Sequence, residues 1–249
     1  YALNALSPKL GGKFQVSTTI IKLIPLALMA LVGTIVGLKN GVLVANFTSG
    51  VIAPVSDNPL FTAVVATAFA YEGWIIATTI NAELRDAKRN LPLALTFGTM
   101  FVALIYILYY TGLAGVVENS VMMKGGEAGA KLAFATVFSE VGGTVLFVFV
   151  VISCLGTLNG LMMGSTRGFY ALAARNLGPS PDVYKNVDKN TNMPTNSSVL
   201  GLLLCGAWLL YFFGANLTEV PWFGPFSFDS SELPIVTLYA MYIPIFLMI

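Results

Sequence analysis

The sequence predicts an all-α protein that crosses a membrane several times, and three observations lead to this fold class. Of the 249 residues, 56% are hydrophobic and only 10% are charged, whereas about a quarter of the residues of a soluble domain are charged. The mean hydropathy is +0.79. The apolar residues are collected into long runs, and a run of about 20 residues is long enough to cross a bilayer as a helix. We therefore expect a bundle of membrane-spanning helices.

The apolar runs divide the chain into six predicted spans. The first run carries one charge, Lys22, the second carries one, Glu72, and the third and fourth carry none. A soluble helical protein does not fit the third run, because a helix without charged residues has no polar face to turn toward water. The spans form a single transmembrane domain and are 16–38, 60–80 with a break near 71–73, 91–117, 141–166, 197–213 and 233–249.

Basic residues are divided unequally between the two sides of this bundle. The loops of one side carry Lys9, Lys13, Arg85, Lys88, Arg89, Arg167, Arg175, Lys185 and Lys189, and the opposite loops carry Lys39, Lys124 and Lys131. Because Lys and Arg are enriched in cytoplasmic loops, we expect the start of the chain in the cytoplasm and the protein in the plasma membrane. The outer loops then include 40–58 and the aromatic-rich stretch 214–234. A short amphipathic helix is expected on the outer face at 127–140.

The residue inventory argues against several function classes. The net charge of +1 gives no basic face for nucleic acid. The sequence has no histidine, and its two cysteines, Cys154 and Cys205, lie inside apolar runs. A zinc site, a disulfide framework and histidine-based catalysis therefore lack the residues that they need. We expect no catalytic residues, no metal and no cofactor, and so no enzyme.

Lys22 is a charged residue a turn or two into the first predicted span. An ionisable group inside a span is costly and usually faces a cavity or a partner. Two interpretations stay open. The long side chain can extend back to the cytoplasmic headgroups, or the amine is buried and functional, in which case it could exchange a proton with its surroundings.

The second predicted span is interrupted by an acidic residue, a glycine and aromatic residues. They form the string Phe69, Ala70, Tyr71, Glu72, Gly73 and Trp74. Glycine permits the helix to unwind, and a discontinuous membrane helix offers backbone carbonyls and amides to a polar substrate. The alternative is that Glu72 is structural and hydrogen-bonded to a neighbouring helix.

The fourth predicted span combines small residues with polar ones. Gly156, Gly160, Gly164 and Gly168 recur every four residues, a stripe that lets another helix approach closely. Ser153, Thr157 and Asn159 lie on adjacent faces. Their side chains could supply oxygens to an ion or an ammonium group, and hydrogen bonds between helices explain them equally well.

Two groups of motifs, taken together, resemble the amino acid–polyamine–organocation (APC) permeases, and in particular their L-type amino-acid transporter branch. The string at 69–74, followed by Asn81–Leu84 and Arg89–Pro92, is similar to the family's sixth helix and the loop after it. The string 153–160, continuing through 165–167 to 174–179, is similar to its eighth helix. Supporting matches are Ser17–Leu23 for the fifth helix and Pro234–Tyr239 for the start of the tenth.

The resemblance covers essentially the whole chain but only about half of the family's twelve spans. It implies a fragment that contains about the fifth to the tenth membrane helices. The implied fold is part of a LeuT-type inverted-repeat bundle, with the last helix of the first repeat followed by the second repeat.

The resemblance also implies roles for individual residues. In the substrate site, Phe69 would be an aromatic gate, the backbone of Phe69, Ala70, Tyr71 and Glu72 would receive the α-ammonium, Gly73 would permit the break, and Trp74 would wall the side-chain pocket. Lys22, Ser153 and Thr157 would form the coupling site, with the ammonium replacing the sodium ion of sodium-coupled relatives. Gly156, Asn159 and Gly160 would pack helices or support that site.

Glu72 departs from the pattern of the branch, which commonly has a small residue there. A carboxylate beside the substrate amine could favour cationic substrates or take part in proton coupling, or it could turn away into the scaffold.

The function implied is secondary active transport of amino acids by alternating access. Amino-acid exchange is the expected mode, and proton symport is compatible with Lys22 and Glu72. The alternative is a non-transporting membrane protein of the same fold, such as an amino-acid sensor or a truncated gene product. The expected partners are an amino-acid substrate, the lipid bilayer and the missing segments of the parent chain, whereas nucleic acid is not expected and a heavy-chain partner is not indicated.

Overall fold

The computed structural model describes residues 1–49, 58–79, 81, 84–228 and 233–248. All regular elements among these residues are helices. The fold class is therefore confirmed as an all-α multi-pass membrane protein. Several predicted features fall partly outside the described residues. They are residues 80 and 249 at the ends of two predicted spans, 50–57 and 229–232 of the two expected outer loops, and Ala82 and Glu83 of the sixth-helix motif.

Four helical stretches are long and apolar enough to cross a membrane. They are Lys9–Asn40, Ala87–Val116, Ala128–Ala173 and Thr195–Leu217. Two shorter apolar helices, Pro59–Ala70 and Pro234–Leu247, lie where the second and sixth spans are predicted. The division into six spans stays a prediction.

The chain forms two compact units. Unit 1 contains residues 1–6, 60–79 and 162–249, and unit 2 contains residues 7–59 and 80–161. The long helix α9 (Glu127–Ala173) contributes to both of them.

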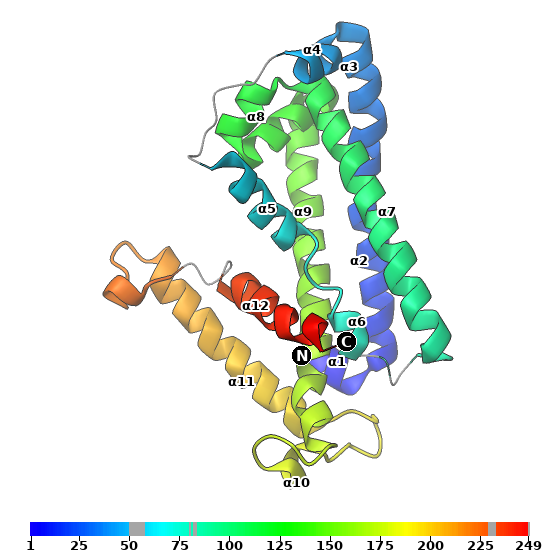
Figure 1. The fold of residues 1–249 in the computed structure, drawn as a ribbon, viewed down its shortest axis with the longest axis vertical. Coiled ribbons are helices and arrows are strands. Elements are labelled where there is room, and N and C mark those ends of the chain that lie inside the picture. Colours follow the sequence, from blue (N-terminus) through cyan, green and yellow to red (C-terminus); the bar gives the residue numbers. More distant parts are fainter. Residues whose placement is uncertain (50–57, 80, 82–83, 229–232, 249) are drawn as a thin grey trace. The chain divides into compact units, whose positions relative to one another are not determined.

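Unit 2 is built around three helical segments. The first begins with α2 (Pro8–Leu28), passes through a π-helical turn at Met29–Gly33 and ends with α3 (Thr34–Asn40). The others are α7 (Ala87–Val116) and the first part of α9, and two short helices, α4 (Val42–Thr48) and α8 (Asn119–Gly125), complete the unit. The segment containing α2 and α3 lies beside α7 near α3, and the two separate toward their other ends (Figure 1).

Glycines bring the first segment and α7 into backbone contact. A Cβ atom on Gly112 would overlap the backbone oxygen of Met29, and a Cβ atom on Gly37 would overlap the backbone of Gly115. Such contacts are possible only without side chains. A small apolar core adjoins this crossing and contains Met29, Leu113, Val117, Ala133 and Phe134.

The end of α7 is closed by a side chain of α4. Asn46 Nδ2 donates to the backbone oxygens of Ala114 at 2.6 Å and Val117 at 2.9 Å. Its Oδ1 accepts the backbone N–H of Asn119 at 3.0 Å. Because the last carbonyls of a helix have no partner within the helix, Asn46 supplies the donors that α7 lacks and fixes α4 against it.

The helix α9 is interrupted near its start. Phe138 and Ser139 have non-helical backbone angles, and the φ angle of Ser139 is 67°. The break separates the first turns of α9 from its long apolar part, which agrees with the short helix expected at 127–140. The apolar part then continues to Ala173, beyond the predicted limit of 166.

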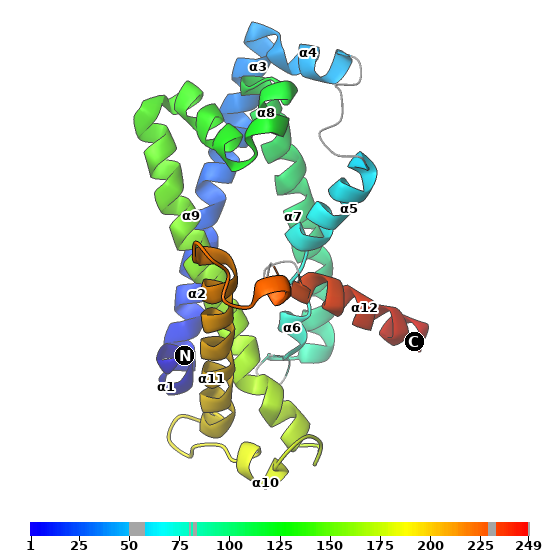
Figure 2. The same cartoon turned by 90° about the vertical axis from the view of Figure 1, so that its left-hand side faces the viewer.

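Unit 1 contains the remaining helices. They are α1 (Ala2–Leu6), α5 (Pro59–Ala70), α6 (Ile76–Thr79), α10 (Pro181–Tyr184), α11 (Thr195–Phe212) and α12 (Leu233–Leu247). The second part of α9 leads through a loop to α10 and α11 (Figure 2). A π-helical turn at Phe213–Leu217 continues α11, and a 3₁₀ turn follows at Gly224–Phe226.

Candidate functional site

The second apolar run is broken between α5 and α6, in unit 1. Tyr71 N–H still donates to the oxygen four residues back, on Thr67, at 3.0 Å. From Glu72 onward the bonds reach only three residues back, as from Glu72 N–H to Phe69 O at 3.2 Å and from Ile76 N–H to Gly73 O at 3.1 Å. The α-helix is therefore interrupted over residues 71–75.

Gly73 allows this break. Its φ angle is +109°, a conformation that side chains with a Cβ atom rarely adopt. A Cβ atom on Gly73 would meet only Ile76 Cδ1, at 4.0 Å. The glycine is therefore needed for its backbone conformation and not for space.

Glu72 lies inside the break, and its two carboxylate oxygens differ in their hydrogen bonding. Oε1 accepts a hydrogen bond from the hydroxyl of Tyr242 at 2.9 Å. Oε2 is buried and has no hydrogen-bond partner among the described residues. Because a buried polar atom without a partner is costly, this oxygen can receive a further donor.

Aromatic side chains of α12 hold the break. Tyr242 is 6% exposed, and its ring lies 5.4 Å from that of Trp74 and 5.4 Å from that of Tyr239. The hydroxyl of Tyr239 donates to Ala68 O at 3.1 Å. Two tyrosine hydroxyls therefore attach α12 to the last turn of α5 and to the acidic side chain that follows it.

The predicted substrate residues are only partly brought together. Glu72 and Trp74 meet at Tyr242, whereas Phe69 is 57% exposed and Ala70 is also exposed. Tyr239 and Tyr242 were missed by the sequence analysis. The available signal was two hydroxyl-bearing residues three apart in an apolar run, which places them on one helix face.

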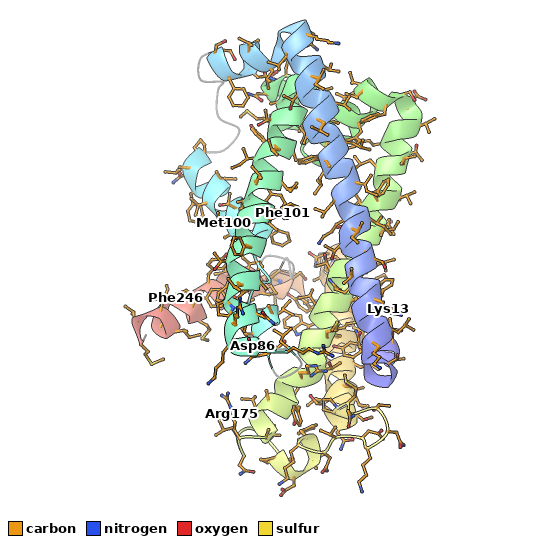
Figure 3. All side chains as sticks on the ribbon, turned by 90° about the vertical axis from the view of Figure 1, so that its right-hand side faces the viewer. Lys13, Asp86, Met100, Phe101, Arg175 and Phe246 are labelled. Carbon is orange, nitrogen blue, oxygen red and sulfur yellow. The ribbon has the colours of Figure 1, made fainter. Side chains whose placement is uncertain are left out.

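The three residues predicted to form an ion or coupling site share one cavity, which lies in unit 2. Lys22 of α2 and both Ser153 and Thr157 of α9 line a cavity of about 360 Å³. The α7 side is lined by Phe101, which Figure 3 labels, and by Tyr106 and Tyr109 among others. Lys22 has no carboxylate partner within the described part of the chain.

Next to this cavity, α9 packs closely on α2. A Cβ atom on Gly156 would lie 2.8 Å from Thr18 Cβ, and one on Gly160 would lie 3.5 Å from Gln15 Nε2. Asn159, which is buried, donates from Nδ2 to Gln15 Oε1 at 2.9 Å. The two glycines and the asparagine therefore hold α2 and α9 together beside Lys22.

The glycine stripe of α9 does not serve one partner helix. Gly156 and Gly160 face α2, but the nearest atoms to a Cβ on Gly164 belong to Ile76 and Thr79 of α6. At Gly168 no described atom lies within 4 Å. The regular spacing therefore combines two separate packing contacts and an open position.

Metal-ligand residue types do not cluster in the described chain. Within these residues, no group of three or more Cys, Asp or Glu side chains is arranged to hold a metal ion. The arrangement instead offers two charged side chains, each beside hydroxyl or aromatic groups. Charged and polar groups of this kind can fix the orientation of a bound polar solute.

Residues 1–249 match the family model described as amino acid permease. The serine/threonine exchanger SteT of Bacillus subtilis is 31% identical over 192 residues, which are 77% of this chain and 42% of SteT. The b(0,+)-type amino acid transporter 1 of Oryctolagus cuniculus is 26% identical over 226 residues, covering 84% of this chain and 46% of the transporter.

A polyamine transporter is also similar. The putrescine transporter PotE of Escherichia coli K12 is 30% identical over 135 residues, covering 53% of this chain and 30% of PotE. The chain thus spans less than half the length of these relatives.

Proposed function

The chain belongs to the amino acid permease family of the APC superfamily, and from this premise we propose that the permease containing it exchanges amino acids across the membrane by alternating access. The observation that carries the proposal is the break at residues 71–75, where an apolar helix is interrupted beside a buried carboxylate oxygen to which no described residue donates a hydrogen bond. The similarity to an exchanger and two transporters supports it.

The break is the proposed position of the substrate. Non-helical backbone inside a membrane is tolerated where it lines a cavity or is buried in protein. The backbone oxygens of residues 69–72 receive the α-ammonium, Phe69 covers it, and Trp74 walls the pocket for the side chain. Tyr242 holds the Trp74 ring and one oxygen of Glu72.

Glu72 is the proposed determinant of substrate class. Tyr242 orients the carboxylate through Oε1, and Oε2 stays available for a positively charged donor. A second ammonium or guanidinium group on the substrate fills that place with a charge-assisted hydrogen bond. Cationic amino acids are therefore the proposed substrates, and a proton on Glu72 is the competing use of the same oxygen.

Lys22 is proposed as a fixed charge in place of a coupling ion. Its side chain lines a cavity with the hydroxyl-bearing residues Ser153 and Thr157, the residue types that would surround a bound cation. With an ammonium group in this place, transport would need no sodium gradient.

Counterflow in liposomes tests the proposal. The intact permease is reconstituted into vesicles loaded with unlabelled lysine, and uptake of labelled lysine is measured with and without the internal amino acid. Exchange predicts uptake that requires internal lysine and is unchanged when sodium is replaced by choline. Absence of uptake for cationic and neutral amino acids alike would instead support a non-transporting sensor of the same fold.

Replacing Trp74 tests, in the same assay, whether its side chain determines which amino acids are preferred. Trp74→Ala is expected to alter the order of preference among amino acids more than the total uptake, because the ring walls the side-chain pocket and does not contact the α-ammonium. An unchanged substrate profile would remove Trp74 from the pocket.

A further inference from the structure

The chain that follows α11 forms a fixed loop, although it is not helical over most of its length. We call residues 217–228 the aromatic loop. The hydroxyl of Tyr211 donates to Phe226 O at 2.7 Å and accepts the backbone N–H of Phe228 at 2.9 Å. The backbone N–H of Trp222 donates to Gly214 O at 2.9 Å. The loop is thereby folded back onto the end of α11.

Ring contacts add to these hydrogen bonds. The ring of Phe223 is stacked on that of Tyr211 at 5.0 Å, and the rings of Trp222 and Phe213 meet edge to face at 5.6 Å. A Cβ atom on Gly214 would lie 2.7 Å from Trp222 Cδ2. The indole therefore sits directly on the backbone of the π-helical turn.

This ordered loop nevertheless exposes large apolar side chains. Val220 is 77% exposed, Phe226 70% and Trp222 60%. Glu219 is the only charged residue between 213 and 228. Such an exposed apolar surface on a fixed backbone indicates a contact with something other than bulk water.

The backbone of the loop restricts where this contact can be. Irregular backbone carries polar groups that the hydrocarbon core cannot satisfy, so the loop cannot lie deep in the bilayer. Its apolar side chains equally disfavour water. The boundary between headgroups and hydrocarbon meets both needs, and tryptophan is enriched there.

The position of the aromatic loop along the chain also places it at the boundary between headgroups and hydrocarbon. The apolar span Thr195–Leu217 ends where the loop begins, so the loop emerges where that helix leaves the hydrocarbon. We propose that the aromatic loop binds the lipid interface and anchors the end of α11 there, with Val220, Trp222 and Phe226 as its lipid-contacting side chains.

Tryptophan fluorescence measures the depth of the loop. In the intact permease, Trp74→Phe and Trp208→Phe, with every tryptophan outside residues 1–249 also replaced, leave Trp222 as the reporter. Vesicles of phosphatidylcholine carry a nitroxide either near the headgroup or deep in the acyl chain. The proposal predicts at least twofold stronger quenching of Trp222 by the shallow nitroxide. Trp222 that only aqueous iodide quenches, or that no quencher reaches, would overturn it.

A spin label at an exposed position tests the same contact without disturbing the rings. Val220→Cys carries the label in a chain with Cys154→Ala and Cys205→Ala, and Val187→Cys in the loop before α11 is the matched control. At position 220 the label should collide with oxygen more often than with a water-soluble nickel complex, and the ratio should reverse at position 187. Equal ratios would place the loop in water, and low collision with both reagents at position 220 would mean that protein covers it.

Discussion

Lys22 and Glu72 are both charged residues within apolar segments, but their surroundings differ. Lys22 lies in unit 2, where α2 packs on α9 at Gly156. The π-helical turn that follows α2 meets α7 at Gly112, and α3 meets it at Gly115. Glu72 lies in unit 1 after α5, a helix in which no residue is buried. Its contacts with α12 include two tyrosine hydroxyls and a ring contact with Trp74.

The two regions differ in the kind of contact that holds their helices together. Backbone contact through glycines leaves no side chain that can move aside, so helices joined in this way shift as a block. Two hydrogen bonds and a ring contact can be exchanged for others at small cost. The positive charge therefore lies among closely packed helices, and the negative charge lies in a segment with fewer close contacts among the described residues; under the proposed function, that segment is the part that rearranges around a substrate.

The largest effect is expected at the positive charge itself. We propose that the ammonium of Lys22 takes the place of a coupling ion, and a hydrogen bond made by such a charged group during transport would contribute about 1.5–3 kcal/mol. Lys22→Ala should therefore lower the exchange rate about 10- to 100-fold while insertion into the membrane is kept. Lys13→Ala, an exposed position on the same helix, is the control in the liposome assay. Wild-type exchange in Lys22→Ala would mean that the amine only extends toward the headgroups.

Rigidity of the closely packed helices is tested at the glycine crossing. Gly112→Ala would force α7 away from Met29, and overpacking of this kind costs about 1–3 kcal/mol. The matched control is Gly98→Ala on the same helix, where no described atom lies within 4 Å. Thermal unfolding followed by size-exclusion chromatography should show a lower midpoint for Gly112→Ala alone. Equal unfolding midpoints for Gly112→Ala and Gly98→Ala would mean that the glycine contact with Met29 does not hold these helices rigidly.

A smaller effect on exchange is expected from the tyrosines of α12 that contact the interrupted helix. Tyr242→Phe keeps the ring on Trp74 but removes the hydrogen bond to Glu72, so lysine exchange should fall about tenfold, as expected for about 1.5 kcal/mol. Tyr239→Phe loses a bond to an uncharged carbonyl and should have less effect. If the two variants lose exchange equally, the hydroxyls act only as attachments of α12.

The smallest effect is expected at Asp188, a charged residue in the loop before α11. It lies outside both regions and shows how much an exposed carboxylate contributes. Backbone N–H groups of Thr191 and Asn190 hold the pKa of Asp188 below its ordinary value. A lowered pKa means that the ionised side chain stabilises the folded loop, and this contribution is present above the ordinary pKa and lost as the pH falls through the lowered one. The protection factor of the Thr191 amide, which compares its exchange rate with the intrinsic rate at the same pH, should therefore fall only in acid, and in Asp188→Asn it should lose this pH dependence.

Features encoded by neighbouring residues could be predicted from the sequence. The long charge-free runs indicate spanning helices, and the glycine beside Glu72 indicates a break. In the structure residues 71–75 are not α-helical. Gly73 takes a φ angle of +109°, and from Glu72 onward the backbone N–H groups bond only three residues back. The grouping of Lys22 with Ser153 and Thr157 came from the family resemblance and not from spacing.

Features that depend on distant residues could not be predicted. The π-helical turn at Met29–Gly33 coincides with contacts to Gly112, and no local pattern announces it. The hydrogen bond from Tyr242 to Glu72 joins residues 170 positions apart. Without knowledge of which helices meet, a tyrosine in an apolar run could equally be a lipid-facing residue.

The most direct test of the account is the substrate selectivity of Glu72→Gln. Uptake of labelled lysine and labelled serine is measured in the same exchanging vesicles, with Glu140→Gln as an exposed acidic control. Because the glutamine removes the negative charge but keeps the shape, the account predicts that lysine uptake falls at least tenfold relative to serine uptake. An unchanged ratio of lysine to serine uptake would contradict the proposal that Glu72 accepts the cationic group of the substrate.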